Sequence, residues 1–138
     1  MTGPAQAEDK AALRRLYQQN NGPAWPFEPE PKQESQTFVA KRRGQVVGLA
    51  SVSLVDYGAR SRATIHELEV TPEASLDAIG RSLLEACLSW LTEHGVPRVY
   101  VHPEDERSYG FYRQAGFEEG WGCLYKIVPV QAAHQTWA

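Results

Sequence analysis

The feature that most constrains the fold is a strand-like run that passes directly into a helix between Glu67 and Leu84. The run ends at Pro72, because proline cannot continue an interior strand. Apolar residues then recur at helical spacing, which predicts an amphipathic helix. Its apolar positions are Leu76, Ile79, Leu83, Cys87, Trp90 and Leu91.

Small residues lie in the first turn of this helix, at Ala78 and Gly80. The first N–H groups of a helix have no partner within it, and together with the helix dipole they favour an anion, typically a phosphate. Close packing is the commoner reason for small residues at a helix start. Both interpretations stay open at this point.

Length and composition limit the classes of protein. A chain of 138 residues predicts one domain over 1–138, with its core at about 8–130. The net charge of −3 argues against nucleic-acid and membrane-surface partners, which usually need a basic face. The chain has neither an apolar run near the ~20 residues of a membrane span nor a secretion-like start, so a cytoplasmic protein is predicted.

The cysteines and histidines do not suggest a metal site. Cys87 and Cys123 lie inside apolar patterns and outside any CxxC, which predicts two buried, reduced thiols. The four histidines lack the spacing of metal ligands, so no metal is predicted.

The N-terminal part predicts a helix over 7–20 and then a loop. Four prolines over 22–36 argue against a regular element there, and long loops in compact domains are often functional. Trp25 and Phe27 lie in this segment. Packing of both rings into the core is slightly favoured, and the alternative is that they line a substrate pocket.

Residues 37–55 predict an antiparallel hairpin with its turn at 43–45, because apolar and β-branched residues flank a glycine. The next strand is 63–70, where the two-residue repeat predicts two faces. One face would carry Ile65, Glu67 and Glu69, and the other His66, Leu68 and Val70.

The C-terminal half predicts a right-handed β-α-β unit. The helix from Leu76 runs to about His94, and the strand 98–102 that follows it would pair in parallel with 63–70. A second helix over 104–115 and one more strand, at about 122–130, follow. The residues beyond are predicted to be a tail in which Trp137 docks or stays exposed.

This order of elements resembles the GNAT superfamily of acyl-CoA-dependent N-acetyltransferases over about residues 8–130. Two motifs carry the resemblance, VTPEASLDAIGRSLL at 70–84 and FYRQAGF at 111–117. The family favours V-x-P, then Q/R-x-x-G-x-G/A and a leucine pair, and later an aromatic residue or leucine, Tyr, three residues and Gly-Phe.

The resemblance implies an α/β fold, an α+β mixed sheet with an antiparallel N-terminal hairpin and helices on both faces. Two parallel strands, 63–70 and 98–102, would splay apart at the centre and admit the pantetheine arm of acetyl-CoA, the co-substrate. That arm would pair with exposed backbone groups of the first strand. The implied cofactor-binding residues are Leu68, Glu69, Val70, Ala78, Ile79, Gly80 and Arg81, with Tyr109 bordering the arm.

The resemblance also implies catalytic roles. The family's tyrosine at the place of Tyr112 commonly protonates the departing thiolate; the alternative is a packed aromatic ring. Glu67 is the candidate base, directly or through water, with Glu69 and His66 as competitors. Glu67 as a plain surface carboxylate is nearly as good an interpretation.

Some residues depart from the family pattern. Ser75 stands where the family has a Gln or Arg, Ala78 replaces the first motif glycine, and Asp77 adds a negative charge beside the predicted phosphate site. These changes are expected to weaken pyrophosphate binding by ~1 kcal/mol or more, with Arg81 as a partial offset. Asp105 replaces a common Asn before the second helix.

Two functions are compatible with the sequence and with this resemblance. The first is an N-acetyltransferase that moves an acetyl group from acetyl-CoA to a primary amine, of a small molecule or a peptide, by direct attack. The second is a non-catalytic GNAT-fold module that binds acyl-CoA or another protein. A homodimer is compatible with apolar faces on the final strand. Acidic residues on the presumed acceptor side are compatible with a cationic amine: Glu28, Glu30, Glu34, Glu67 and Glu69.

Overall fold

The computed structural model describes residues 1–58, 60–120 and 123–129. Within these ranges six strands form one sheet in the order β1-β2-β3-β4-β6-β5, and only the pairing of β3 with β4 is parallel. The predicted mixed α/β architecture, with its N-terminal hairpin and its parallel pair, is confirmed. The predicted positions of Trp137, Gly122 and Val130 lie outside the described residues.

The predicted helices are present, and the structure adds strand residues that were not predicted. The helical segments are η1 (Ala7–Asp9), α1 (Lys10–Asn21), the π-helical turn η2 (Leu76–Gly80), α2 (Arg81–Glu93) and α3 (Glu106–Gln114). The strands are β1 (Phe27–Arg42), β2 (Gln45–Gly58), β3 (Ser61–Val70), β4 (Arg98–Val101), β5 (Glu118–Gly120) and β6 (Cys123–Ile127).

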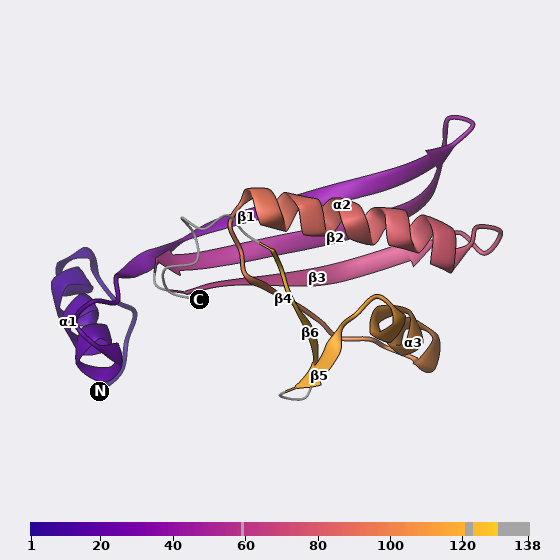
Figure 1. Cartoon of the computed structure of the whole chain (residues 1–138). Helices are drawn as coiled ribbons and strands as arrows, with labels where there is room; N and C mark the ends of the chain where they lie inside the picture. Colours follow the sequence, from indigo (N-terminus) through magenta and orange to yellow (C-terminus); the bar gives the residue numbers. More distant parts are fainter. Residues whose placement is uncertain (59, 121–122, 130–138) are drawn as a thin grey trace.

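The long β1–β2 hairpin turns at two residues in the left-handed region, Arg43 with φ 51° and Gly44 with φ 77°. Such a turn matches the twist of the two strands. Figure 1 shows α2 lying along β1, β2 and β3, while α1 lies beyond the far end of the hairpin. Two ion pairs join α1 to β1, Lys10 with Glu30 at 3.2 Å and Arg14 with Glu28 at 3.3 Å.

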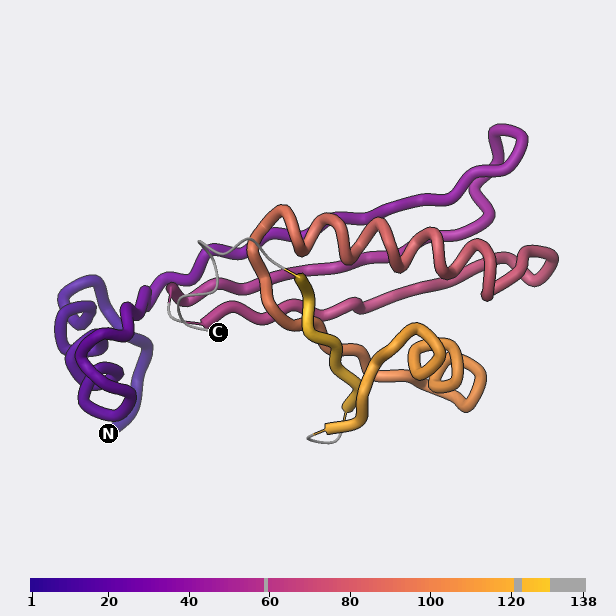
Figure 2. Tube along the Cα trace, in the orientation of Figure 1, coloured from indigo at the N-terminus to yellow at the C-terminus, as the bar shows by residue number. Residues whose placement is uncertain are grey.

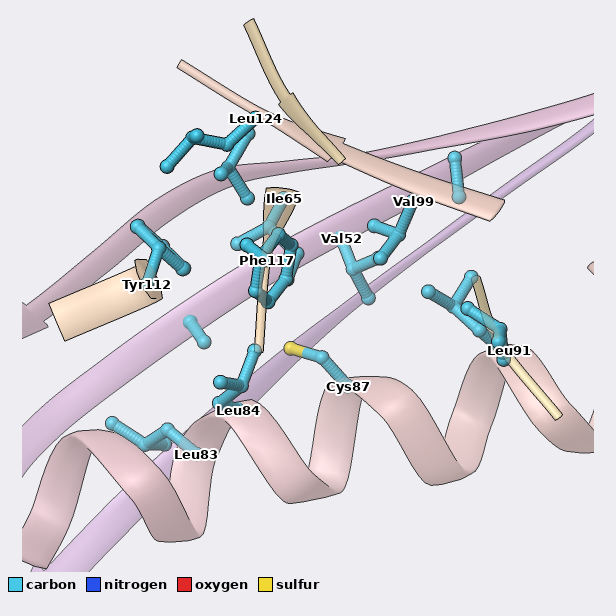
Figure 3. Close-up of a cluster of buried hydrophobic side chains, with 14 of the residues drawn as sticks. Val52, Ile65, Leu83, Leu84, Cys87, Leu91, Val99, Tyr112, Phe117 and Leu124 are labelled. Atoms are coloured by element: carbon cyan, nitrogen blue, oxygen red, sulfur yellow. The ribbon is translucent and has the colours of Figure 1, made fainter. Parts of the chain in front are cut away.

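The core forms between the sheet and the apolar side of α2. Phe117 is 1% exposed and lies in the middle of the cluster, with Leu84 and Cys87 of α2 pointing toward it (Figure 3). Burial raises the pKa of the Cys87 thiol to about 11. Cys123 is only partly buried, so the prediction of two buried thiols is wrong for that residue.

The predicted proline-rich loop over 22–36 is wrong, because β1 already begins at Phe27. Prolines are tolerated on an edge strand and at bulges, where a missing N–H breaks no ladder. Here β1 is an edge strand, and its register shifts between Phe27 and Lys32, the interval that contains Pro29 and Pro31.

The slightly favoured packing of Trp25 and Phe27 into the core is also wrong. Neither ring belongs to the buried cluster. Phe27 lies instead between Tyr17 and Tyr57, with ring centroids 4.5 Å and 5.8 Å away. This stack lines a surface pocket.

A bulge in β3 corrects the predicted faces of that strand. Ser51 pairs with Glu67 while its neighbour Val52 pairs with Ile65, so His66 is an extra residue in the ladder. A bulge of this kind shifts the alternation of side chains. Ile65 therefore lies in the core, Leu68 and Val70 pack against it, and Glu67 and Glu69 are exposed: the glutamates do not share the face of Ile65.

The described residues after Gly116 form two strands, where one was predicted. The missed strand is β5, whose residues Glu118, Glu119 and Gly120 show no apolar alternation. Pairing with β6 is what makes this segment a strand.

Candidate active site

The parallel strands β3 and β4 part soon after they meet. Their ladder in the described chain contains two pairs, Ala63 with Val99 and Thr64 with Tyr100. The two strands then diverge, β3 running on along the hairpin and β4 turning toward α3 (Figures 1 and 2). The predicted splayed seam is therefore present.

Backbone groups of β3 face this seam. The N–H of Thr71 donates to the carbonyl of Val47 at 2.8 Å, on the β2 side. Because backbone groups alternate along a strand, those of Glu69 also face β2 and those of Leu68 and Val70 face the seam. Leu68 and Val70 thus present amide groups that β4 does not pair.

A narrow cleft of about 170 Å³ occupies the seam. Its walls are β3 from Ile65 to Val70, the end of β4, the first turns of α3, and Leu76. It brings together five of the predicted catalytic and cofactor-binding residues, Glu67, Leu68, Glu69, Val70 and Tyr112, and also the competing base His66. The lining does not include Ala78, Ile79, Gly80, Arg81 or Tyr109.

Tyr112 is held rigidly at the cleft. It is 6% exposed and packs edge-on against Phe111 and Phe117, with centroid distances of 5.3 Å and 5.1 Å. Burial raises the pKa of its phenol well above the usual value, and repulsion from the Cys87 thiolate that forms at high pH and from the carboxylates of Glu67 and Glu69 adds to the shift. The hydroxyl therefore keeps its proton at neutral pH and serves as a hydrogen-bond donor.

Three candidate bases line the cleft together. Glu67 and Glu69 are exposed on β3, and His66 beside them contacts Ser53 Oγ through Nε2 at 2.5 Å. The other glutamates predicted to lie on the acceptor side do not line the cleft. Glu28 and Glu30 pair with α1, and Glu34 lies 2.7 Å from His94. The acidic character of the cleft thus comes from β3 and from Glu104 and Asp105, directly before α3.

The small-residue turn is largely satisfied by the chain itself. Ser75 Oγ accepts the N–H of Ala78 at 3.1 Å, and the Ser75 carbonyl accepts that of Ile79 at 2.9 Å. Gly80 is buried, and a Cβ there would lie 3.2 Å from the ring of Phe111. The packing interpretation therefore describes Gly80, and any anion that used the Ala78 amide would displace Ser75.

Arg107 is a site residue that the sequence analysis missed. It lines the cleft and also the adjoining groove between η2 and α3, next to Leu76 and Asp77. The amides of these two residues open the η2 turn, where N–H groups have no partner within the helix. The sequence could have indicated this residue, because Arg107 is a cation five residues before Tyr112 on the same helix. Other missed cleft residues are His102, Glu104 and Ser108.

Asp105 orders the start of α3 beside the cleft. Its Oδ1 accepts the N–H of Ser108 at 2.8 Å, and the Ser108 hydroxyl donates to the same oxygen at 2.9 Å. This hydrogen bond from the Ser108 backbone, followed by that from its hydroxyl, lowers the pKa of the Asp105 carboxyl. A D-x-x-S sequence is a recognisable N-cap pattern.

We expect this cap to contribute to stability above the unfolded carboxyl pKa of about 3.9 and to lose that contribution as the pH falls through the lowered folded value. Asp105→Asn keeps a capping oxygen without the charge. Melting temperatures of both proteins between about pH 6 and pH 2 should differ at neutral pH and converge in acid. A constant difference across that range would contradict the charge's role.

The described ranges contain neither a metal-binding cluster nor a membrane-spanning helix. No group of three or more His, Cys, Asp and Glu side chains there is placed to share a metal ion. No helix in those ranges combines the length and apolarity needed to span a bilayer.

Comparisons with known proteins agree with this geometry. The sequence profile of the Acetyltransferase (GNAT) family matches residues 10–117. A mycothiol acetyltransferase of Propionibacterium freudenreichii subsp. shermanii is 33% identical over 76 residues, which are 54% of this chain and 24% of that protein. An uncharacterised N-acetyltransferase of Chlorobaculum tepidum is 33% identical over 82 residues, 59% of this chain and 49% of that protein.

The matches thus span about a quarter and about half of these two relatives. Among solved structures, an acetyltransferase from Bacillus cereus superposes with a TM-score of 0.60 at 17% identity, covering 92% of this chain and 96% of its own. That likeness supports the fold alone. Because the family profile covers more than half of the sequence, and the seam, cleft and motifs lie within or directly beside it, this chain belongs to the Acetyltransferase (GNAT) family.

Proposed function

We propose that this domain transfers an acetyl group from acetyl-CoA to a primary amine, of a small molecule or a peptide, by direct attack. Acetyl-CoA is the acyl donor that the family uses. The observation that carries the proposal is the parted seam between β3 and β4, because it gathers free strand amides, a buried phenol and exposed carboxylates in one cleft.

The chain's residues fit this donor. The unpaired backbone groups of Leu68 and Val70 would bind the pantetheine amides in the manner of an added strand. Arg107, together with the first amides of η2 at Leu76 and Asp77, would hold the pyrophosphate. The amides of Ala78 and Ile79 would join only on release from Ser75, and Gly80, Arg81 and Tyr109 would contribute from outside the cleft.

Acetyl-CoA supplies a thioester carbonyl with which the amine nitrogen forms a bond as the carbon–sulfur bond breaks. Glu67 would accept a proton from the acceptor's ammonium group, directly or through water, so that the neutral amine can attack, with Glu69 and His66 as the competing groups. Tyr112 would donate a hydrogen bond and then its proton to the sulfur as negative charge develops there, and the second proton that the nitrogen loses would restore the phenol. The raised pKa of its phenol favours donation of a hydrogen bond over early loss of the proton.

The carboxylates that line the cleft also indicate the charge of the acceptor. Glu67, Glu69, Glu104 and Asp105 line the cleft, against the cations of Arg107 and, when protonated, His66 and His102. Such a lining attracts a cationic amine to the seam. We therefore expect an amine that is charged at neutral pH to be the acceptor.

Binding of acetyl-CoA is tested by thermal unfolding. Ligand at 100 times its dissociation constant should stabilise the domain by about 2.7 kcal/mol. Arg107→Gln should raise that dissociation constant roughly 10-fold, because it removes a charged contact to phosphate. Arg15→Gln is the matched control, since Arg15 is exposed on α1, which lies at the other end of the hairpin from α3 and the cleft (Figure 1).

The absence of a shift at millimolar acetyl-CoA would favour the second function, a non-catalytic GNAT-fold binding or interaction module. One observation supports that alternative, namely that Ser75 already occupies two of the amides the family motif would offer. If acetyl-CoA raises the melting temperature but no amine is acetylated, the domain is a non-catalytic module that binds acyl-CoA.

A further inference from the structure

A second pocket lies at the opposite end of β3 from the active-site cleft. Its volume is about 610 Å³, within the range of small-molecule sites. Arg62 at this pocket and Leu68 at the cleft are roughly 20 Å apart by the rise of an extended strand. The residues that matter for its chemistry are Tyr17, Asn21, Phe27, Tyr57, Arg60 and Arg62.

Three parallel rings form one wall of this pocket. Tyr17 and Phe27 stack with 12° between their planes, and Phe27 and Tyr57 with 2°. Tyr57 ends the stack and is 39% exposed, so ring surface remains accessible. A further planar group would extend such a stack in an offset geometry.

The polar part of the pocket is cationic. Arg60 donates through Nη2 to Asn21 Oδ1 at 3.4 Å, which ties it to α1. Arg62 is exposed, and its side chain makes no hydrogen bond or ion pair in the described part of the chain. None of the described lining residues is acidic. A guanidinium with free N–H groups matches the fork of a carboxylate.

We propose that this pocket binds a planar aromatic monocarboxylate, with its ring on the Tyr57 end of the stack and its carboxylate on Arg62. The stack selects for a ring, and the Arg62 guanidinium, which has no side-chain partner among the described residues, selects for a carboxylate. The site is independent of acetyl transfer, because it shares no lining residue with the cleft.

The probes are benzoate, benzamide and acetate, titrated into the full chain and followed by calorimetry and by the NMR signals of the aromatic side chains. Benzoate should bind saturably, with a dissociation constant of the order of 1 mM or below. Benzamide lacks the charge and acetate lacks the ring, so each should bind at least about 10-fold more weakly.

Two variants separate the two contacts. Arg62→Gln should reduce benzoate affinity to that of benzamide, while Arg42→Gln at the hairpin tip leaves it unchanged. Tyr57→Leu should reduce benzoate affinity to that of acetate; both substituted residues are exposed, so the fold should persist. The proposal is overturned if benzoate does not saturate, if acetate binds equally well, or if Arg62→Gln binds benzoate as the wild type does.

Discussion

Tyr112→Phe should lower the rate constant of acetyl transfer about 100-fold, the lower end of what a positioned proton donor contributes. The phenol is buried at the cleft and keeps its proton at neutral pH, so it is available to stabilise charge on the leaving sulfur. Phenylalanine retains the ring that packs on Phe111 and Phe117. The rate constant is measured at saturating acetyl-CoA with an accepted amine.

The control for this experiment is Tyr100→Phe. Tyr100 lies on β4, where it forms the last β3–β4 pair with Thr64, and is not part of the cleft lining. It should leave the turnover unchanged, and both variants should retain the melting temperature and the shift on adding acetyl-CoA. Equal turnover of Tyr112→Phe and the wild type would remove Tyr112 from its proposed role.

Phe117→Ala should reduce the free energy of unfolding by about 3–5 kcal/mol, because a large fully buried ring is replaced by a cavity. Phe117 is 1% exposed and lies between α2, the sheet and Tyr112 (Figure 3). Such a loss is a large part of the stability of a domain of this size. Denaturant unfolding of the two proteins measures it.

Ile127→Ala supplies the comparison. Ile127 is apolar but 56% exposed at the end of β6, so its truncation should change the free energy of unfolding by only about 0.5 kcal/mol. A cost below about 1 kcal/mol for Phe117→Ala would mean that this ring is not the centre of the core. If Phe117→Ala costs more free energy of unfolding than Ile127→Ala, the Gly-Phe motif has a structural role at the site, because Phe117 packs against one side of the Tyr112 ring.

Several site features were predictable because their signals are local. The helix from Leu76 and the strand before Pro72 follow from hydrophobic spacing, and the right-handed crossover makes the next strand parallel. The hairpin turn follows from Gly44. The predicted seam and the position of Tyr112 beside it depend on these signals and on the resemblance carried by the two motifs.

Other features depend on partners that a local pattern does not contain. The prolines of β1 are tolerated because that strand lies at the sheet edge, and β5 is a strand because β6 pairs with it. The bulge at His66 arises from the register of β3 against β2, and it turns Glu67 and Glu69 to the exposed side. Arg107 enters the site because α3 packs against η2.

By itself, then, the amino-acid sequence determined the order of the helices and of every strand but β5, and the joint between β3 and α2, because side-chain periodicity and turn chemistry act over a few residues. Only the tertiary structure decided which residues face the cleft and that Tyr17, Phe27 and Tyr57 stack beside two arginines. These outcomes depend on strand register and on contacts between distant segments, which no short stretch of sequence encodes.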